Sequence, residues 1–494
     1  MLAEKVLQTP LSRLSDPRLF REYAYVSGRW RAAADGAVRE VRNPATGDIL
    51  GAVAMLGAAE AREAVDAASA AFAGWRARLP QERAEILRAW YVAIIANRED
   101  LALLMTLEQG KPIREARGEI DYAAGFVAWY AEEAKRSNIE SVTAHLAAAD
   151  MTVRREPLGV AALVTPWNFP SAMLTRKAAA ALAAGCTVVA RPAMETPFSA
   201  LALAELGERA GLPPGVFNLV TGAAPAIVDV FCESPAVRVL SFTGSTTVGR
   251  RLAAQCAAGI KRLVMELGGH APFIVFPDAD ITKALDGAMA AKFATSGQDC
   301  LAANRFFIHR DIYDDFVAAF AERSRALCVG DGLDEATDIG PLMNERAVAK
   351  CSAHVADALA KGARLVVGGE HHRCGPLFFA PTVLADVPAD ALIMREETFG
   401  PVAAFAPFDD EDAVLATAND TEYGLVAYLF TADYRRMSRF GRALDFGMVA
   451  VNRVTLTGAS IPFGGTKQSG IGREGGRWGM EAFTDIKYLC IDTA

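Results

Sequence analysis

The fold is decided by two short apolar runs, Val160-Ala161-Ala162-Leu163-Val164 and Cys186-Thr187-Val188-Val189-Ala190, with helical sequence between them. Each run has the length and the continuous apolarity of a buried strand. Residues 174–184 have the pattern of a helix that ends at Gly185, a residue typical of helix C-termini. A strand, a helix and a second strand in this order predict neighbouring strands of a doubly wound parallel sheet.

Further helices and strands extend this pattern. The predicted elements are helices at 59–77, 81–106, 115–135 and 198–210, strands at 216–220 and 237–242, and, after Glu266, a strand at 273–276 and a helix at 281–292. Helices alternate with short strands to about residue 460. The chain is therefore predicted to be an α/β protein with two doubly wound parallel-sheet domains, and such sheets bind ligands at the carboxyl ends of their strands.

Length and composition narrow the class of protein. With 494 residues, 52% of them apolar, the chain is long enough for two or three domains with large cores. The net charge of −8 argues against nucleic acid or an anionic membrane as main partner. The eight cysteines are scattered, without a C-x-x-C pair, so a reducing compartment and no metal site are expected. No secretory pattern and no apolar run of roughly 18 residues is present, which favours a cytoplasmic protein.

Three motifs supply side chains for covalent catalysis. Cys300 ends the string Phe293-Ala294-Thr295-Ser296-Gly297-Gln298-Asp299-Cys300, in which small, turn-forming residues can present a thiol to a cleft. Glu266 precedes Leu267-Gly268-Gly269, and Asn168 lies within Thr165-Pro166-Trp167-Asn168-Phe169-Pro170. The three side chains are candidates for a nucleophile, a proton acceptor and an oxyanion donor. Taken singly, each has an ordinary alternative as a core thiol, a surface carboxylate or a turn residue.

In these motifs and their order the chain resembles the aldehyde dehydrogenase superfamily, from about residue 25 to the C-terminus. The resemblance implies that Cys300 forms a thiohemiacetal and then a thioester, that Glu266 is the general base, and that Asn168 donates to the oxyanion. It also implies a cofactor-binding domain at 1–140 and 158–265 and a catalytic domain at 266–462. Residues 141–157 and 463–494 are expected to form a small β oligomerisation arm and a C-terminal tail, and hence a homodimer or homotetramer.

The resemblance implies NAD or NADP as cofactor, although no G-x-G-x-x-G string opens a strand–helix unit. The family's pyrophosphate site matches residues 242–249, where Gly244 permits close approach and Ser245 begins a helix. Glu397 and Phe399 match the residues that hold the nicotinamide ribose and back the ring. The other expected cofactor residues are Thr165, Pro166, Trp167, Leu267, Arg191, Met194 and Glu195.

Part of the adenosine site departs from the family pattern. Arg191 stands where the family has a lysine, and Met194 where it has a glutamate that holds the adenosine ribose and repels a 2′-phosphate. Methionine does neither, whereas Arg191 can pair with phosphate, and Glu195 lies one residue out of register. Use of both NAD and NADP is therefore expected.

The substrate class follows from a narrower resemblance. Leu174-Thr175-Arg176-Lys177 and residues 462–490 look most like the succinate-semialdehyde dehydrogenase branch, which implies that Arg176 and Thr457 contact a substrate carboxylate. A second arginine of that branch is replaced by Ala294. The predicted function is oxidation of succinate semialdehyde or a related semialdehyde to the acid. Two alternatives remain: a dehydrogenase for uncharged or aromatic aldehydes, and a non-catalytic nucleotide-binding or structural protein on the same scaffold.

Overall fold

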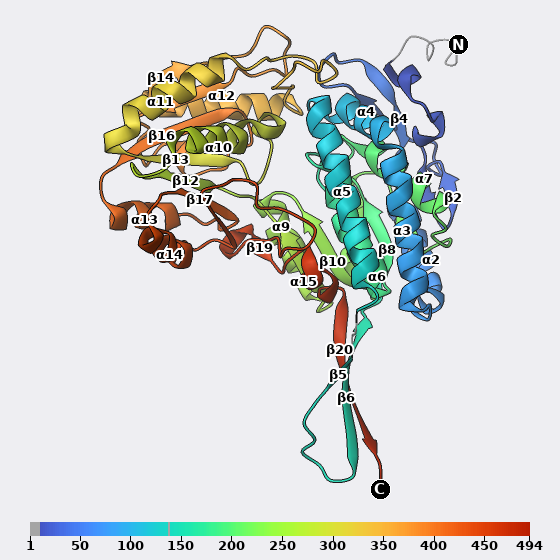
Figure 1. Cartoon of the computed structure of the whole chain (residues 1–494). Coiled ribbons are helices and arrows are strands. Elements are labelled where there is room, and N and C mark those ends of the chain that lie inside the picture. Colours follow the sequence, from blue (N-terminus) through green and yellow to red (C-terminus); the bar gives the residue numbers. More distant parts are fainter. Residues whose placement is uncertain (1–9, 137–138) are drawn as a thin grey trace.

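The structure is a computed structural model that describes residues 10–136 and 139–494. The chain forms two α/β bodies, each built on one sheet, and a β arm that projects from the first body (Figure 1). The first sheet has the order β19 (Gly470–Ile471), β11 (Arg262–Glu266), β10 (Val237–Thr243), β7 (Val160–Val164), β8 (Thr187–Arg191), β9 (Phe217–Leu219), β1 (Ala24–Val26) and β2 (Arg29–Arg31). Strands β11 to β9 are parallel, whereas β19, β1 and β2 pair antiparallel at the two edges.

Helices cover both faces of the first sheet. They are α2 (Ala58–Arg76), α3 (Pro80–Ala96), α4 (Arg98–Gln109), α5 (Ile113–Glu133), α6 (Pro170–Ala184), α7 (Pro197–Arg209), α8 (Ala224–Glu233) and α9 (Thr246–Ala257). Alternate side chains of β7 enter two separate cores: Ala161 and Leu163 pack with α3 to α7, and Val160 and Ala162 pack with α2, α8 and α9. This burial on both faces explains why β7 is apolar throughout.

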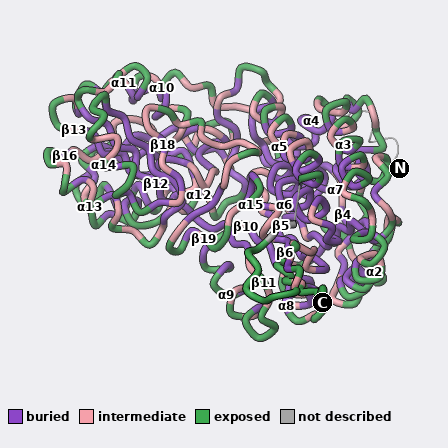
Figure 2. Tube along the Cα trace, turned by 60° about the horizontal axis from the view of Figure 1, so that its bottom comes forward, coloured by how far each residue is buried: buried purple, intermediate pink, exposed green. Residues whose placement is uncertain are grey.

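The second sheet carries the region after Glu266. Its order is β14 (Arg364–Val367), β15 (Thr382–Ala385), β16 (Val402–Phe408), β13 (Ala303–His309), β12 (Ala271–Val275), β17 (Val426–Phe430) and β18 (Met448–Val451). It is covered by α10 (Ile281–Phe293), α11 (Arg310–Arg325), α12 (Glu345–Ala360), α13 (Glu411–Asn419) and α14 (Tyr434–Ala443). Figure 2 shows the buried trace concentrated inside these two bodies.

The arm is a small antiparallel sheet of β5 (Ile139–Ser141), β6 (Ala149–Pro157) and β20 (Thr484–Asp492). Strand β20 pairs with β6 along its whole length, from Thr484 opposite Pro157 to Asp492 opposite Ala149. The short helix α15 (Gly476–Glu481) leads into β20, and a separate ribbon is formed by β3 (Val38–Arg42) and β4 (Ile49–Ala54). The predicted fold class, two parallel-sheet bodies with a β arm, agrees with this architecture.

Local boundaries differ from the sequence-based expectations in two places. The helix predicted at 81–106 is two helices, because Asn97 leaves the helical conformation and its side-chain amide donates to the carbonyl of Ala93 at 2.8 Å. Helix α6 begins at Pro170 instead of Leu174. Proline is tolerated there because the backbone N–H that it lacks would have no acceptor within the helix at the first helical position. Of the helices in the described ranges, none is both long and apolar enough to cross a membrane.

The loop of residues 294–300, here called the Cys300 loop, has an uncommon backbone. Thr295, Ser296 and Gly297 have φ values of 50°, 58° and 73°, which places three consecutive residues in the left-handed region. A Cβ added at Gly297 would collide with the carbonyl group of Gly400. The loop is therefore packed directly against the backbone of the segment that carries Glu397 and Phe399.

We expect Gly297→Ala to lower the melting temperature by several degrees, because the added methyl strains a left-handed residue and displaces Gly400, at a cost of roughly 1–3 kcal/mol. The matched control is Gly74→Ala, on an exposed position of α2 with no neighbour to strike, which should not lower it. Differential scanning calorimetry of both variants checks this. Equal melting temperatures would contradict the close packing of the Cys300 loop.

Candidate active site

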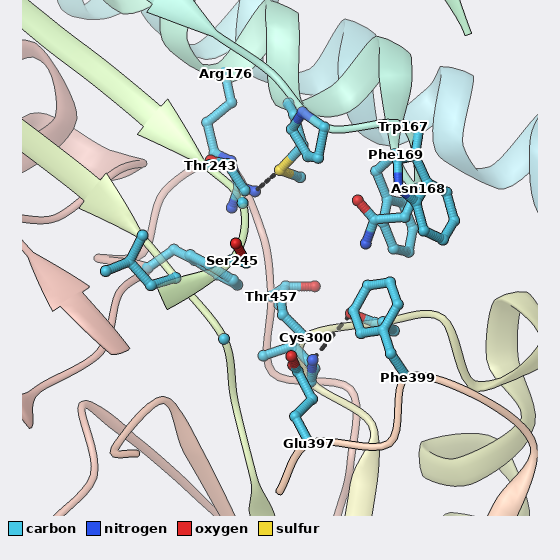
Figure 3. A pocket seen from close by; sticks show the side chains of 18 of the residues that line it. Trp167, Asn168, Phe169, Arg176, Thr243, Ser245, Cys300, Glu397, Phe399 and Thr457 are labelled. Atoms are coloured by element: carbon cyan, nitrogen blue, oxygen red, sulfur yellow. Dashed lines mark hydrogen bonds between the residues drawn. The ribbon is translucent and has the colours of Figure 1, made fainter. Parts of the chain in front are cut away.

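A cavity of about 360 Å³ collects residues from both bodies. The first body contributes the segments that follow β7 and β10, at the carboxyl ends of parallel strands, and the second contributes the Cys300 loop and the segment 397–399. The predicted site residues that line it are Pro166, Trp167, Asn168, Arg176, Gly244, Ser245, Leu267, Cys300, Glu397, Phe399 and Thr457. In the view of Figure 3, Arg176 lies at the upper left and Asn168 at the right, and Thr457 and Cys300 lie below them.

Cys300 presents its thiol to this cavity just before β13 begins. Burial raises the pKa of the thiol well above its usual value. The neighbouring carboxylates, first of all Asp299 and Glu266, raise it further, and Arg176 opposes them. The resting side chain is therefore a neutral thiol, and attack on a carbonyl carbon needs a group that removes its proton.

Asn168 is fixed by a buried ion pair. Its side-chain amide donates to the carbonyl of Gln298 at 3.1 Å, so the turn after β7 is bonded to the Cys300 loop. The backbone carbonyl of Asn168 accepts from Nζ of Lys111 at 2.8 Å, and Lys111 pairs with Glu119 at 2.5 Å. Glu119 also accepts two backbone N–H groups from the first turn of α6. The second N–H of the Asn168 amide is left for a group in the cavity.

Glu266, the predicted base, lies behind the cavity wall. It ends β11 and is 2% exposed, and a Cβ added at Gly464 would come within 2.7 Å of its Oε1. Among the described residues neither carboxylate oxygen has a hydrogen-bond partner. Burial raises the pKa of Glu266 well above its usual value, and Glu474 raises it further. The side chain thus does not line the cavity, and its surroundings favour the protonated form over the carboxylate.

A charge cluster occupies the space next to Glu266. Nε of Arg176 lies 3.1 Å from Oε2 of Glu474, and Lys177 forms a short ion pair with the same carboxylate. Burial alone would raise the pKa of Glu474, but the charges of Lys177 and Arg176 outweigh it and hold that pKa below its usual value. The guanidinium of Arg176 also lies 4.2 Å from the ring centre of Phe463. Arg176 therefore lines the cavity as a charged group whose counter-ion lies behind it.

The opposite end of the cavity has the predicted nicotinamide residues. Oε1 of Glu397 accepts the backbone N–H of Gly269 at 2.9 Å, and burial raises the pKa of Glu397 to about 7. Phe399 and Trp167 meet edge to face, with ring centres 5.6 Å apart. Ser245 caps α9, its hydroxyl accepting from the backbone N–H of Val248 at 3.4 Å. A helix N-terminus that opens on the same cavity as these rings suits a nucleotide with a pyrophosphate.

The remaining predicted cofactor residues lie outside the cavity. Arg191 donates from Nε and Nη2 to the carbonyl of Gly222, at 3.2 and 2.9 Å, and burial lowers its pKa to about 10. Met194 is buried, and its sulfur accepts the N–H of Gly222 at 3.1 Å. Glu195 is paired with Arg39 at 3.4 Å, and Thr165 is buried beneath this region. One edge of the Arg191 guanidinium thus already donates to a backbone carbonyl.

Other residues that contribute to the site were not predicted from the sequence. Among them are Lys111, which donates to the backbone carbonyl of Asn168, Glu474, which pairs with Arg176, and Tyr122 and Asp299, which line the cavity. Burial raises the pKa of the Tyr122 hydroxyl, and a hydrogen bond to Thr457 opposes the shift. Each is an ordinary helix or loop residue in the sequence, so only the tertiary fold identifies it.

Comparison with known proteins places this site in a family. The model of the aldehyde dehydrogenase family matches residues 30–489. The chain is 54% identical to the aspartate-semialdehyde dehydrogenase (non-phosphorylating) of Halomonas elongata over 97% of each chain. It is 53% identical to the succinate-semialdehyde dehydrogenase (NADP(+)) GabD of Escherichia coli over 97% of this chain and 99% of that protein. It is 50% identical to the glutarate-semialdehyde dehydrogenase of Pseudomonas aeruginosa, with the same coverage.

Solved structures agree with this result. The succinate-semialdehyde dehydrogenase of Burkholderia pseudomallei has a TM-score of 0.96 and 51% identity, covering 97% of this chain and 100% of that one. The betaine aldehyde dehydrogenase of Staphylococcus aureus, in complex with NAD+, has a TM-score of 0.95 and 32% identity, covering 98% of this chain and 97% of that one. The predicted fold class and superfamily are confirmed, and the chain belongs to the aldehyde dehydrogenase family.

Proposed function

We propose that this chain is an NAD(P)-dependent dehydrogenase that oxidises a semialdehyde, an aldehyde with a carboxylate at its far end, to the corresponding acid. The observation that carries the proposal is one cavity that holds both Cys300 and Arg176. A thiol can attack the aldehyde carbon, and a guanidinium is the side chain best suited to a carboxylate. The relatives named for aspartate, succinate and glutarate semialdehydes support the same substrate class.

The first chemical step needs Glu266 to turn from Gly464 into the cavity, because the Cys300 thiol keeps its proton at rest. Glu266, once ionised, takes that proton, and a bond forms between Sγ and the aldehyde carbon. The carbonyl oxygen becomes an oxyanion, which accepts the free N–H of the Asn168 amide and the backbone N–H of Cys300. The product is a thiohemiacetal on Cys300.

The residues around Phe399 fit a nicotinamide dinucleotide. Gly244, Ser245 and the N-terminus of α9 would hold the pyrophosphate, and Glu397 the ribose beside the ring. A nicotinamide held by these residues would supply the hydride acceptor for oxidation of the substrate carbon. Glu266 then deprotonates a water molecule that hydrolyses the Cys300 thioester, which releases the acid and restores the thiol.

Both NAD and NADP are proposed as cofactors. The support is the buried thioether of Met194, which has no charge to repel a 2′-phosphate. Nη1 of Arg191 has no hydrogen bond to Gly222 and is the part of the fork that can meet a phosphate.

A homodimer or homotetramer in the cytoplasm is also proposed. Strand β20 forms one edge of the arm sheet, and Ile486, Tyr488 and Ile491 on it are exposed at 60%, 51% and 47%. An exposed apolar edge strand is a surface on which a second chain can add a strand. The scattered cysteines favour a reducing compartment.

We expect Cys300→Ser to reduce turnover to below a few per cent of wild type. The serine hydroxyl is much less acidic than the thiol, so it is a poor nucleophile at this site. The measurement is the absorbance of reduced cofactor with succinate semialdehyde and benzaldehyde, each with NAD and with NADP. Binding of both nucleotides, followed by quenching of tryptophan fluorescence, should persist as the control for folding. Wild-type protein that oxidises no aldehyde in the panel would overturn the proposed function.

Glu266→Gln should leave a burst of reduced cofactor followed by slow turnover, because glutamine cannot take a proton from water. A base with a raised pKa acts only once it is deprotonated, so wild-type turnover should increase as the pH rises through that pKa. The variant should lack this increase. Stopped-flow absorbance across a pH series measures both effects, and a variant with wild-type burst and steady state would exclude Glu266 as the base.

Arg176→Ala should lower kcat/KM for succinate semialdehyde about tenfold or more relative to butanal, because a charge-assisted hydrogen bond contributes about 1.5–3 kcal/mol. The ratio of the two substrates cancels effects on the thiol and on folding. Arg176→Lys, which keeps the charge beside Glu474, should retain part of the preference. An equal loss for both substrates in Arg176→Ala would show that the arginine is structural and favour an uncharged or aromatic aldehyde.

A further inference from the structure

Asp299 puts a second carboxylate into the wall of the cavity, directly before the nucleophile in the chain. Its Oδ1 accepts the backbone N–H of Leu301 at 3.0 Å, which is a turn-forming contact that asparagine makes equally well. The turn alone therefore does not require a charged residue. The negative charge also works against the reaction, since it raises the pKa of the Cys300 thiol.

The cations near Asp299 are already paired with other residues. Lys111 pairs with Glu119 at 2.5 Å, and Arg176 lies 3.1 Å from Glu474. Burial raises the pKa of Asp299, and the hydrogen bond from Leu301, the charge of Lys111, a hydrogen bond with the Cys300 side chain and the charge of Arg176 oppose this shift in part. Asp299 is half-buried and forms no ion pair of its own among the described residues, so a cationic ligand group in the cavity would supply the missing counter-ion.

We propose that Asp299 binds an ammonium group of the substrate, so that the preferred aldehyde carries an amino group as well as a carboxylate. This rests on the proposed function, in which the aldehyde carbon meets Cys300 and the carboxylate meets Arg176. Adjacent Cα atoms are about 3.8 Å apart, so the ammonium lies only a few bonds from the aldehyde carbon. A four-carbon semialdehyde with an amino group next to its carboxylate has this spacing.

The charges of Arg176 and Asp299 also discriminate between substrates. An anionic semialdehyde without an amino group would meet Arg176 but be repelled by Asp299, whereas a purely cationic aldehyde would be repelled by Arg176. A zwitterion satisfies both groups. The lining carries one cation, Arg176, and the carboxylates of Asp299 and Glu397, and Ala294 stands where the resembled branch has a second arginine.

Four matched aldehydes test the proposal. They are 2-amino-4-oxobutanoate, 4-oxobutanoate, 3-aminopropanal and propanal, which carry both charged groups, the carboxylate only, the ammonium only and neither. We expect wild type to have the highest kcat/KM for the first. In Asp299→Asn, which keeps the turn to Leu301, the ratio of kcat/KM with and without the amino group should fall about tenfold or more in both pairs.

The control is Glu115→Gln, which removes a half-buried carboxylate of α5 that contacts the Cys300 loop. Oε2 of Glu115 accepts the N–H of Thr295 at 2.8 Å, but its side chain does not line the cavity. This variant should keep the wild-type ratios, because any effect of lost charge on the thiol acts on all four substrates alike. Ratios that stay within twofold in Asp299→Asn, or fall equally in Glu115→Gln, would overturn the assignment of Asp299. Oxidation of 4-oxobutanoate would still leave the proposed function standing, whereas failure with all four aldehydes would remove both.

Discussion

Two cations buried side by side on α6 are compensated by the carboxylate of Glu474, and the path of the C-terminal segment depends on this pairing. Arg176 and Lys177 are each 1% exposed, and an uncompensated buried charge costs several kcal/mol. Glu474 reaches Lys177 from 297 residues further along the chain. To bring it there, the C-terminal segment crosses the cavity: Phe463 and Glu474 exchange backbone hydrogen bonds, Phe463 covers the Arg176 guanidinium, and β19 joins the first sheet.

The low-dielectric environment that makes this cluster necessary also sets the state of the catalytic groups. Burial raises the pKa values of both Cys300 and Glu266, so the Cys300 thiol is neutral at rest, while the charges of Lys177 and Arg176 lower the pKa of Glu474. Oxidation of a cysteine proceeds through the thiolate, so a neutral thiol is protected between turnovers. The same burial means that a substrate with charged groups changes the electrostatics of the site when it enters.

The sequence predicts the parts of the fold that depend on local pattern. The strands at β7 and β8 and the end of α6 at Gly185 follow from apolar runs and a left-handed glycine. The break at Asn97 is not predictable in the same way, because no proline or glycine marks it and the helical pattern continues across it. The missed break reflects a side-chain hydrogen bond, which periodicity does not contain.

The residues of the candidate site also differ in whether local sequence or only the tertiary fold identifies them. Cys300 and Asn168 are recognisable because their motifs are unusual strings, and both line the cavity. The placement of Glu266 depends on its side-chain rotamer and on Gly464, nearly two hundred residues away, so sequence identifies the residue but not its direction. Asp299 and Tyr122 become visible only when three separate segments meet, since nothing in their local sequence distinguishes a cavity wall from a surface.

The pairing of α6 with the C-terminal segment also orders events during synthesis. A ribosome delivers α6 and the strands around it long before Glu474, Phe463 and β20 emerge. Until then Arg176 and Lys177 have no Glu474, so burying them is unfavourable and the helix keeps access to water. The last part of the chain to be made is the part that allows the catalytic chamber to close. The set of contacts around Arg176 and Lys177 is therefore complete only after the C-terminal segment has been synthesised.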